Sequence, residues 1–230
     1  STISRRLEFL SAKETALARK CFALERVPTF CPGCPHNTST NVPDGSRAVA
    51  GIGCHYMATW AHGRNTSTFT HMGGEGVTWV GQAAFTETPH VFANLGDGTY
   101  FHSGLLAIRQ SVAARVNITY KILYNDAVAM TGGQPVDGQL SVPMIVRQLQ
   151  AEGVYNIVVV TDGTPRRYGP ANLPHGIGLR HRREFDAIQR EFRELPGTSA
   201  IIFDQTCAAE KRRRRKRGRL PDPPVRAFIN

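Results

Sequence analysis

The sequence has no long hydrophobic run. None of its apolar stretches approaches the roughly 20 residues that a helix needs to cross a bilayer. Residues 1–20 interleave Arg and Glu with Leu, and no apolar stretch follows a basic start as it would in a signal peptide. We therefore expect a cytoplasmic protein without a membrane span. With 41% hydrophobic and 20% charged residues, the 230-residue chain can build one sizeable core.

Aromatic residues are absent from the most basic stretch of the chain. Much of the formal net charge of +10 comes from residues 211–217 (KRRRRKR), and Arg219 follows directly. Proteins that bind single-stranded nucleic acids combine such charges with aromatic side chains, so we expect no nucleic-acid partner. Three interpretations of residues 211–217 stay open: a solvated or linker segment, a targeting-like patch, or a surface that docks an acidic protein or a phosphate.

No internal repeat is visible, and short strand-like runs alternate with helix-like segments. The apolar runs are bounded by Gly, Asp or Asn and cover residues 48–52, 91–95, 118–124, 157–160 and 200–203. Helical patterns lie between them at 76–85, 103–114, 143–152 and 182–194. This alternation predicts an α/β fold in which a mostly parallel sheet carries helices on both faces. Such sheets bind ligands beyond the carboxyl ends of their strands.

The sequence pattern divides the chain into three parts. Residues 1–30 are expected to form a leading helix and a linker, and residues 31–209 form the main domain. Residues 210–230 hold the basic run and a Pro-rich stretch, which predicts a linker to a following domain.

A glycine-rich turn follows the run at 91–95. Gly96-Asp97-Gly98 precedes a helical pattern, so its backbone can turn tightly and face an anion at the start of a helix. Asn125 ends the next strand-like run. Two neighbouring strand ends would then offer a carboxylate and an amide oxygen to one Mg²⁺, which prefers oxygen ligands completed by phosphates. An ordinary turn at Asp97 with a strand-end cap at Asn125 is the alternative interpretation.

Cysteines are few, and four of the five fall in expected loops. Cys31 and Cys34 form a Cys-x-x-Cys pair, Cys54 follows the first strand-like run, and Cys207 follows the last. Such a pair can belong to a zinc site, a redox dithiol or an iron–sulfur site. Four thiolates gathered from three loops would suit a [4Fe–4S] cluster. Cys21 stands apart in the leading helix, where we expect a small buried apolar residue.

Longer motifs carry a family resemblance over nearly the whole chain. Residues 31–40 (CPGCPHNTST), 50–57 (AGIGCHYM) and 71–76 (HMGGEG) resemble the indolepyruvate:ferredoxin oxidoreductases in their long fused bacterial form. These enzymes belong to the 2-oxoacid:ferredoxin oxidoreductase superfamily. Segments 96–104, 124–134 and 204–218 continue the match. The resemblance implies the thiamine-diphosphate-binding fold of the diphosphate (PP) type.

The resemblance also implies a set of site residues. The Asp97 and Asn125 side chains and the Ala127 carbonyl would hold Mg²⁺ against thiamine diphosphate. Residues expected to approach or contact that cofactor are Gly53, His55, Gly96, Gly98 and Thr99. The implied [4Fe–4S] ligands are Cys31, Cys34, Cys54 and Cys207. Candidates for acid–base chemistry or for contact with the substrate carboxylate are His36, His55 and His71.

The implied reaction is oxidative decarboxylation of a 2-oxoacid, with indolepyruvate or another arylpyruvate as substrate. The cofactor carries the chemistry, CoA accepts the acyl group, and two electrons pass singly through the cluster to ferredoxin. The resemblance changes the interpretation of residues 211–217 to a structural segment, or one that packs against another domain or an acidic ferredoxin.

One expected part of a thiamine enzyme is missing from the sequence. No residue is a convincing candidate for the glutamate that contacts the aminopyrimidine, because Glu75 lies in a Gly-rich loop of the diphosphate-side module. We therefore expect an internal segment of a longer chain that also carries the pyrimidine-side module and a gamma-type domain. We expect the full-length enzyme to be a homo-oligomer.

Two other classes of protein fit part of the pattern. A non-redox thiamine-dependent decarboxylase or carboligase would keep Asp97 and Asn125 but has no use for four gathered cysteines. A zinc-stabilised basic binding module would explain Cys31, Cys34 and the basic run without any thiamine.

Overall fold

The central element of the structure is a seven-stranded sheet. The structure is a computed structural model, and it describes residues 2–18, 27–134, 138, 140–163 and 168–225. The strand order of the sheet is β2-β1-β3-β4-β7-β5-β6, and every pair of neighbouring strands is parallel. The strands are β1 (Ala48–Ala50), β2 (Thr66–Phe69), β3 (Val91–Gly96), β4 (Ile118–Tyr124), β5 (Ile157–Thr161), β6 (Gly178–His181) and β7 (Thr198–Asp204). The predicted parallel α/β fold is confirmed.

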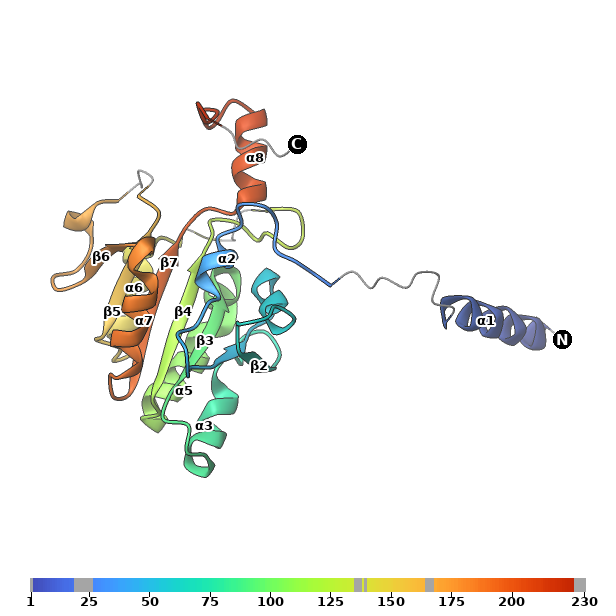
Figure 1. Ribbon diagram of the computed structural model, residues 1–230, viewed down its shortest axis with the longest axis horizontal. Coiled ribbons are helices and arrows are strands. Elements are labelled where there is room, and N and C mark those ends of the chain that lie inside the picture. The colour runs from blue at the N-terminus through green and yellow to red at the C-terminus, as the bar shows by residue number, and fades with distance from the viewer. Residues whose placement is uncertain (1, 19–26, 135–137, 139, 164–167, 226–230) are drawn as a thin grey trace.

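The α-helices are α1 (Thr2–Ala18), α2 (His36–Ser39), α3 (Val77–Gln82), α4 (Asp97–Thr99), α5 (Leu105–Ala114), α6 (Val142–Ala151), α7 (Phe185–Arg193) and α8 (Ala208–Lys216). The shorter turns are η1 (Cys54–Thr59), η2 (Ala83–Phe85), η3 (Tyr100–Gly104), η4 (Pro170–Asn172) and η5 (Arg182–Glu184); η3 is a π-helical turn. Figure 1 shows α8 leaving the carboxyl end of β7. Helix α1 buries none of its residues.

Two hydrophobic clusters fill the two faces of the sheet. On one face, strand side chains such as Ile122 pack with Trp79 of α3, Ile108 of α5 and Ile145 of α6. On the other face, residues such as Phe203 of β7 pack with α7. Strands β3, β4, β5 and β7 are buried on both faces, and for this reason they read as nearly continuous apolar runs in the sequence.

A lysine interrupts the second cluster. Lys121, in the middle of β4, is fully buried, and its Nζ donates to the carbonyl of Asn41 over 3.0 Å and to Gln189 Oε1 over 3.4 Å. The ammonium also lies over the rings of Phe92 and Phe185. Burial, with a smaller contribution from the charge on Arg64, lowers the pKa of Lys121 from 10.5 to about 7.

None of the helices in the described ranges combines the length and apolar character needed to cross a membrane. The division of the chain into residues 1–30, 31–209 and 210–230 stays a prediction.

Candidate functional site

Asp97 joins the carboxyl ends of β3 and β4. Its Oδ2 accepts hydrogen bonds from the backbone N–H groups of Asn125 (2.9 Å) and Asp126 (3.0 Å), and its Oδ1 accepts from the N–H of Gly98 (2.9 Å). The two strands are paired in register up to Gly96 and Leu123, so the turn at Asp97 and the loop that begins at Asn125 emerge side by side. The structure thus brings together the two residues that the sequence predicted to share a cation.

Burial dominates the electrostatics of Asp97. It raises the pKa of the carboxyl group from 3.8 to about 6, although the three backbone donors stabilise the charged form and oppose the shift. The nearby Asp126 adds a smaller increase. A buried carboxylate in this position would be stabilised by a cation placed against it.

The remaining donors at this edge are oxygen atoms that do not belong to carboxylates. The side chain of Asn125 is mostly buried, and its Oδ1 accepts from the N–H of Ala127 over 3.2 Å. Among the described residues, no group of three or more His, Cys, Asp or Glu side chains is arranged to hold a metal ion. A cation here would use one carboxylate, one amide oxygen and one carbonyl, and would need phosphate oxygens to complete its shell. That donor set fits Mg²⁺ bound with a diphosphate.

A buried group of polar atoms lies next to this edge, around Gly51 in the loop after β1. Three side chains of this group have buried atoms without hydrogen-bond partners in the described structure: His55 (Nε2), Glu75 (Oε1) and Asn94 (both amide atoms). A Cβ atom at Gly51 would overlap the Asn94 carbonyl and lie 2.7 Å from His55 Nε2 and 2.8 Å from Glu75 Cγ. Buried polar atoms are almost always paired with protein, water or ligand. This group therefore fits a site that a polar cofactor or ordered water completes.

The three candidate histidines lie in different environments. His36 and His55 are both buried, with their rings edge to face and 5.8 Å apart. Burial lowers the pKa of His36 to about 4 and that of His55 to about 3, so both rings are neutral at pH 7. His71 is exposed, in the loop that follows β2. As neutral rings, the first two can donate or accept hydrogen bonds at neutral pH, but such low pKa values make them weak proton acceptors. Catalytic roles for all three stay predictions.

The glycine-rich segment leaves space for a ligand close to the backbone. A Cβ at Gly98 would meet only the Val128 side chain, at an ordinary 3.6 Å, and one at Gly96 would meet His55 Cε1 at 3.3 Å. Thr99 is buried in α4, which leads through the π-helical turn η3 into α5. Gly53 has φ of 152° and lies against the His55 ring. Contacts from these residues to a cofactor stay predictions.

Four free thiols converge beside this edge. Cys31 and Cys34 lie on one turn, closed by a hydrogen bond of 2.9 Å from the Cys34 N–H to the Cys31 carbonyl. Burial is the main cause that raises the pKa of the Cys34 thiol to about 11. A backbone hydrogen bond from His36 opposes the shift, and the charges on Cys207, Cys31 and Cys54 contribute to it. Burial also raises the pKa of Cys54, with added effects from Cys207 and Cys31. These electrostatic effects indicate that the thiols lie near one another, and thiolates are the ligands that iron–sulfur clusters use. Their role as ligands of one cluster stays a prediction. Cys21 lies outside the described residues.

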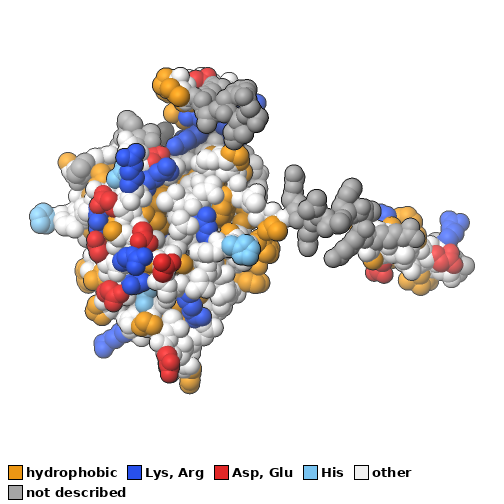
Figure 2. Space-filling model, viewed as in Figure 1, with side chains coloured by type: hydrophobic (Ala, Val, Ile, Leu, Met, Phe, Trp, Pro, Cys, Tyr) orange, Lys and Arg blue, Asp and Glu red, His pale blue; other side chains and the backbone are white. Residues whose placement is uncertain are grey.

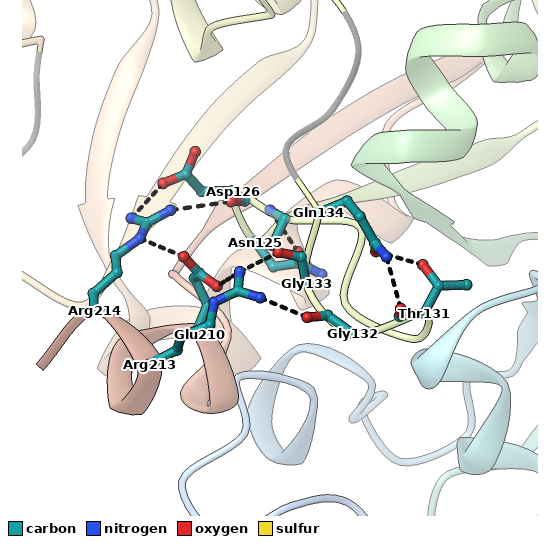
Figure 3. A network of polar contacts seen from close by, with 10 residues as sticks. Asn125, Asp126, Thr131, Gly132, Gly133, Gln134, Glu210, Arg213 and Arg214 are labelled. Atoms are coloured by element: carbon teal, nitrogen blue, oxygen red, sulfur yellow. Dashed lines mark hydrogen bonds and ion pairs between the residues drawn. The ribbon is translucent and has the colours of Figure 1, made fainter. Parts of the chain in front are cut away.

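Helix α8 connects the cysteines to the loop after β4. The backbone N–H of Cys207, directly before α8, donates to the carbonyl of Asn125 over 3.0 Å. Glu210, Arg213 and Arg214 of the same helix make a polar network with the loop residues Asp126, Gly132 and Gly133 (Figure 3). At least three of the seven residues in the basic run therefore make contacts inside the molecule, because Lys211 also pairs with Asp162.

Sequence reasoning missed two buried carboxylates at the site. Glu75 was noted only as a poor candidate for the activating glutamate, yet it is fully buried, and burial raises its pKa. Glu210 was hidden at the start of a basic run. The one signal for Glu210 in the sequence is its spacing: it lies three and four positions before Arg213 and Arg214, where side chains of a helix can pair.

Comparison with known proteins agrees with this geometry. Residues 51–158, which contain Asp97 and Asn125, match the family described as thiamine pyrophosphate enzyme, C-terminal TPP binding domain. The chain is similar to indolepyruvate oxidoreductase subunit IorA of Thermococcus kodakarensis (27% identity; 81% of this chain and 30% of the relative). It is also similar to IorA of Pyrococcus abyssi (30% identity; 80% of this chain and 30% of the relative). The chain thus spans about a third of the length of these relatives.

A solved structure shares the fold. It is a 2-oxoglutarate:ferredoxin oxidoreductase from Magnetococcus marinus with 2-oxoglutarate, coenzyme A and succinyl-CoA bound. It matches with a TM-score of 0.58 and 21% identity over 79% of this chain and 65% of that one. At 21% identity this likeness shows the fold, and the matched domain and the sequence relatives agree with the predicted family. The chain carries a thiamine pyrophosphate-binding domain and is a relative of the indolepyruvate oxidoreductases, which are oxidoreductase enzymes.

Proposed function

We propose that this chain is the diphosphate-side module of a 2-oxoacid:ferredoxin oxidoreductase. The enzyme oxidatively decarboxylates an arylpyruvate such as indolepyruvate. The overall reaction converts one 2-oxoacid, one CoA thiol and two oxidised ferredoxins into acyl-CoA, CO₂, two singly reduced ferredoxins and one proton. The observation that carries the proposal is the hydrogen bond from the N–H of Cys207 to the carbonyl of Asn125. It places a candidate cluster ligand directly beside a candidate magnesium ligand.

The residues of this chain bind and orient the cofactor. Asp97 and Asn125, with the Ala127 carbonyl, would hold Mg²⁺ and through it the diphosphate. When bound, thiamine diphosphate supplies the nucleophilic carbon that adds to the ketone and the electron sink that permits loss of CO₂. The rings of His36 and His55 are buried and neutral beside this edge. His55 Nε2 has no hydrogen-bond partner within the described structure and is available to form a hydrogen bond with a group of the cofactor or substrate.

Cys31, Cys34, Cys54 and Cys207 would hold the [4Fe–4S] cluster, which supplies one-electron transfer. The backbone hydrogen bond from Cys207 to Asn125 supports electron passage between the two candidate sites, because it brings a ligand of each close to the other. A non-redox decarboxylase needs no such thiol set, and a zinc module would leave the thiamine-binding family match unexplained. These two alternatives are therefore disfavoured.

The surface next to Cys34 supports an acidic electron acceptor. An open cavity of about 420 Å³ is lined by Cys34 together with His181, Arg182 and Arg183 from the connection between β6 and α7. Figure 2 shows Lys and Arg side chains gathered below α8 on the face in view. Basic surfaces steer acidic partners to a site and suit the small, transient interfaces of electron-transfer complexes.

An anaerobic assay of the full-length protein tests the proposal. We expect reduction of a viologen dye that depends on thiamine diphosphate, Mg²⁺ and CoA, with arylpyruvates as the preferred members of a panel of 2-oxoacids. Anaerobically purified protein should contain iron and labile sulfide. If no 2-oxoacid reduces the dye, the oxidoreductase proposal fails; if iron and sulfide are absent while 2-oxoacids are decarboxylated, the non-redox alternative holds.

A further inference from the structure

Glu210 is a nearly buried carboxylate that holds two arginines. It lies in the first turn of α8, three residues after Cys207, and only 8% of its surface is exposed. Its Oε1 accepts from Arg214 Nε over 2.7 Å, and its Oε2 accepts from Arg213 Nη2. Without this carboxylate, the two adjacent guanidinium groups would repel each other and turn toward solvent.

The two arginines hold both ends of the loop after β4 (Figure 3). Arg214 donates to Asp126 Oδ2 over 2.7 Å and to the Asp126 carbonyl over 3.3 Å. Arg213 donates to the carbonyls of Gly132, over 2.6 Å, and Gly133. The loop is closed between these points, because the Val128 N–H donates to the Gln134 carbonyl over 2.8 Å. Glu210 therefore fixes, through its arginines, the segment that contains Ala127.

Asp126 shows why this segment needs to be held. Its φ is 59°, in the left-handed region that non-glycine residues seldom adopt. Such a conformation persists only where surrounding contacts enforce it. Asp97 accepts from the Asp126 N–H on one side, and Arg214 donates to the Asp126 side chain and carbonyl on the other. Within this turn Asn125 Oδ1 accepts from the Ala127 N–H over 3.2 Å, so the two candidate cation ligands lie next to each other.

We propose that Glu210 is a positioning residue that couples the iron–sulfur site to the thiamine diphosphate site. This inference rests on the proposed function. Cluster binding at Cys207 fixes the start of α8, and through Glu210, Arg213 and Arg214 the helix holds the loop in the form that binds Mg²⁺–diphosphate. Because coupling between two binding sites is reciprocal, the bound cofactor also strengthens retention of the cluster. Binding of thiamine diphosphate and binding of the cluster then favour each other. A protein molecule that holds the cofactor therefore also tends to hold the cluster that accepts its electrons.

The test measures the affinity of the full-length protein for thiamine diphosphate at fixed Mg²⁺, with the cluster intact and after its removal by a chelator under anaerobic conditions. In the wild type we expect removal of the cluster to weaken binding about tenfold, within the usual range of allosteric coupling. In Glu210→Gln the cluster-loaded protein should bind about tenfold more weakly than the wild type, and removal of the cluster should change its affinity by less than twofold.

Matched variants separate coupling from general stability. Glu152→Gln removes a carboxylate that pairs with Arg109 between α6 and α5, and it should keep the wild-type tenfold ratio. Arg214→Gln should reproduce the Glu210→Gln result, and the double variant should be no worse than either single one. If Glu210→Gln does not fold, Glu210→Asp replaces it in the test. This variant should retain part of the ratio between the thiamine diphosphate affinities with and without the cluster.

Iron retention is the reciprocal measurement. Thiamine diphosphate with Mg²⁺ should shift the equilibrium of iron loss to a chelator about tenfold toward retention in the wild type but not in Glu210→Gln. Equal cofactor affinity with and without the cluster in the wild type would overturn the coupling, and so would a tenfold ratio that survives in Glu210→Gln. In those cases both sites are occupied and the dye assay still works, so the proposed function stands. A protein that takes up no iron overturns the cluster assignment and the coupling together.

Discussion

The carbonyl oxygen of Asn125 accepts a hydrogen bond of 3.0 Å from the backbone N–H of Cys207. The two residues are distant in sequence, but Asn125 directly follows β4 and Cys207 lies three positions after the end of the neighbouring β7. The register of these strands runs from Ile118 opposite Thr198 to Tyr124 opposite Asp204. One sheet edge therefore carries both the oxygen donors around Asp97 and the thiol donors around Cys34. Four further experiments test how this edge is built.

Asp97→Asn should weaken binding of thiamine diphosphate by at least tenfold at saturating Mg²⁺. The amide has the shape of the carboxyl group and can still accept from the Asn125 N–H, but it lacks the negative charge that attracts the cation. Calorimetric titration of the full-length protein measures the effect. Asp186→Asn, which removes a carboxylate from a surface pair with Arg190, is the control and should bind as the wild type does. Equal affinity for Asp97→Asn would remove this residue from the cation site.

Cys34→Ser and Cys207→Ser should each lose most of the iron and labile sulfide after anaerobic reconstitution, because a cluster needs all four thiolates for full stability. Iron and sulfide analysis, with the visible absorption of the cluster, gives the readout. Cys21→Ser should keep the wild-type content, since Cys21 lies outside the motifs that predict the cluster ligands. Replacement of iron by one bound zinc per chain would favour a structural zinc site instead.

Gly51→Ala should destabilise the protein by about 2 kcal/mol or more, because the added methyl group would overlap the Asn94 carbonyl and press on His55. The matched control is Gly81→Ala in α3, where nothing lies within 4 Å of the added Cβ. That change should stabilise the helix by about 0.5–1 kcal/mol. Urea unfolding of both variants measures the difference. A Gly51→Ala variant as stable as the wild type would show that the buried polar group around Gly51 is not closely packed.

Lys121 should make stability rise with pH in the alkaline range. Its folded pKa is about 7 and its ordinary value is 10.5, so between these values the unfolded chain binds more protons than the folded chain. The free energy of unfolding then increases with pH by about 1.4 kcal/mol per unit. Below pH 7 the lysine is charged in both states, and the full cost of burying it remains.

Comparison with Lys121→Met isolates this contribution. The stability of the wild type minus that of the variant should increase steadily from pH 7 to pH 10, as measured by denaturant unfolding at each pH. Parallel pH profiles for the two proteins would mean that Lys121 stays charged in its buried position.

The sequence by itself determined the buried parts of the fold. The predicted runs at 91–95, 118–124 and 157–160 fall on β3, β4 and β5, since strands covered on both faces must be apolar throughout. Strands β2 and β6 were missed. Both are edge strands of four residues with partly exposed side chains, and TSTF and GLRH carry no apolar pattern to read.

The sequence also determined the chemistry of the site through Asp97, Asn125 and the Cys-x-x-Cys pair, because tight turns and soft donors require particular residue types. Only the tertiary structure decided which of these residues meet. Strand order places β7 beside β4, and so brings Cys207 to Asn125. Likewise, only the tertiary structure shows that Glu210 and Glu75 are buried. Burial depends on contacts between segments far apart in the chain, and no local pattern in the sequence records those contacts.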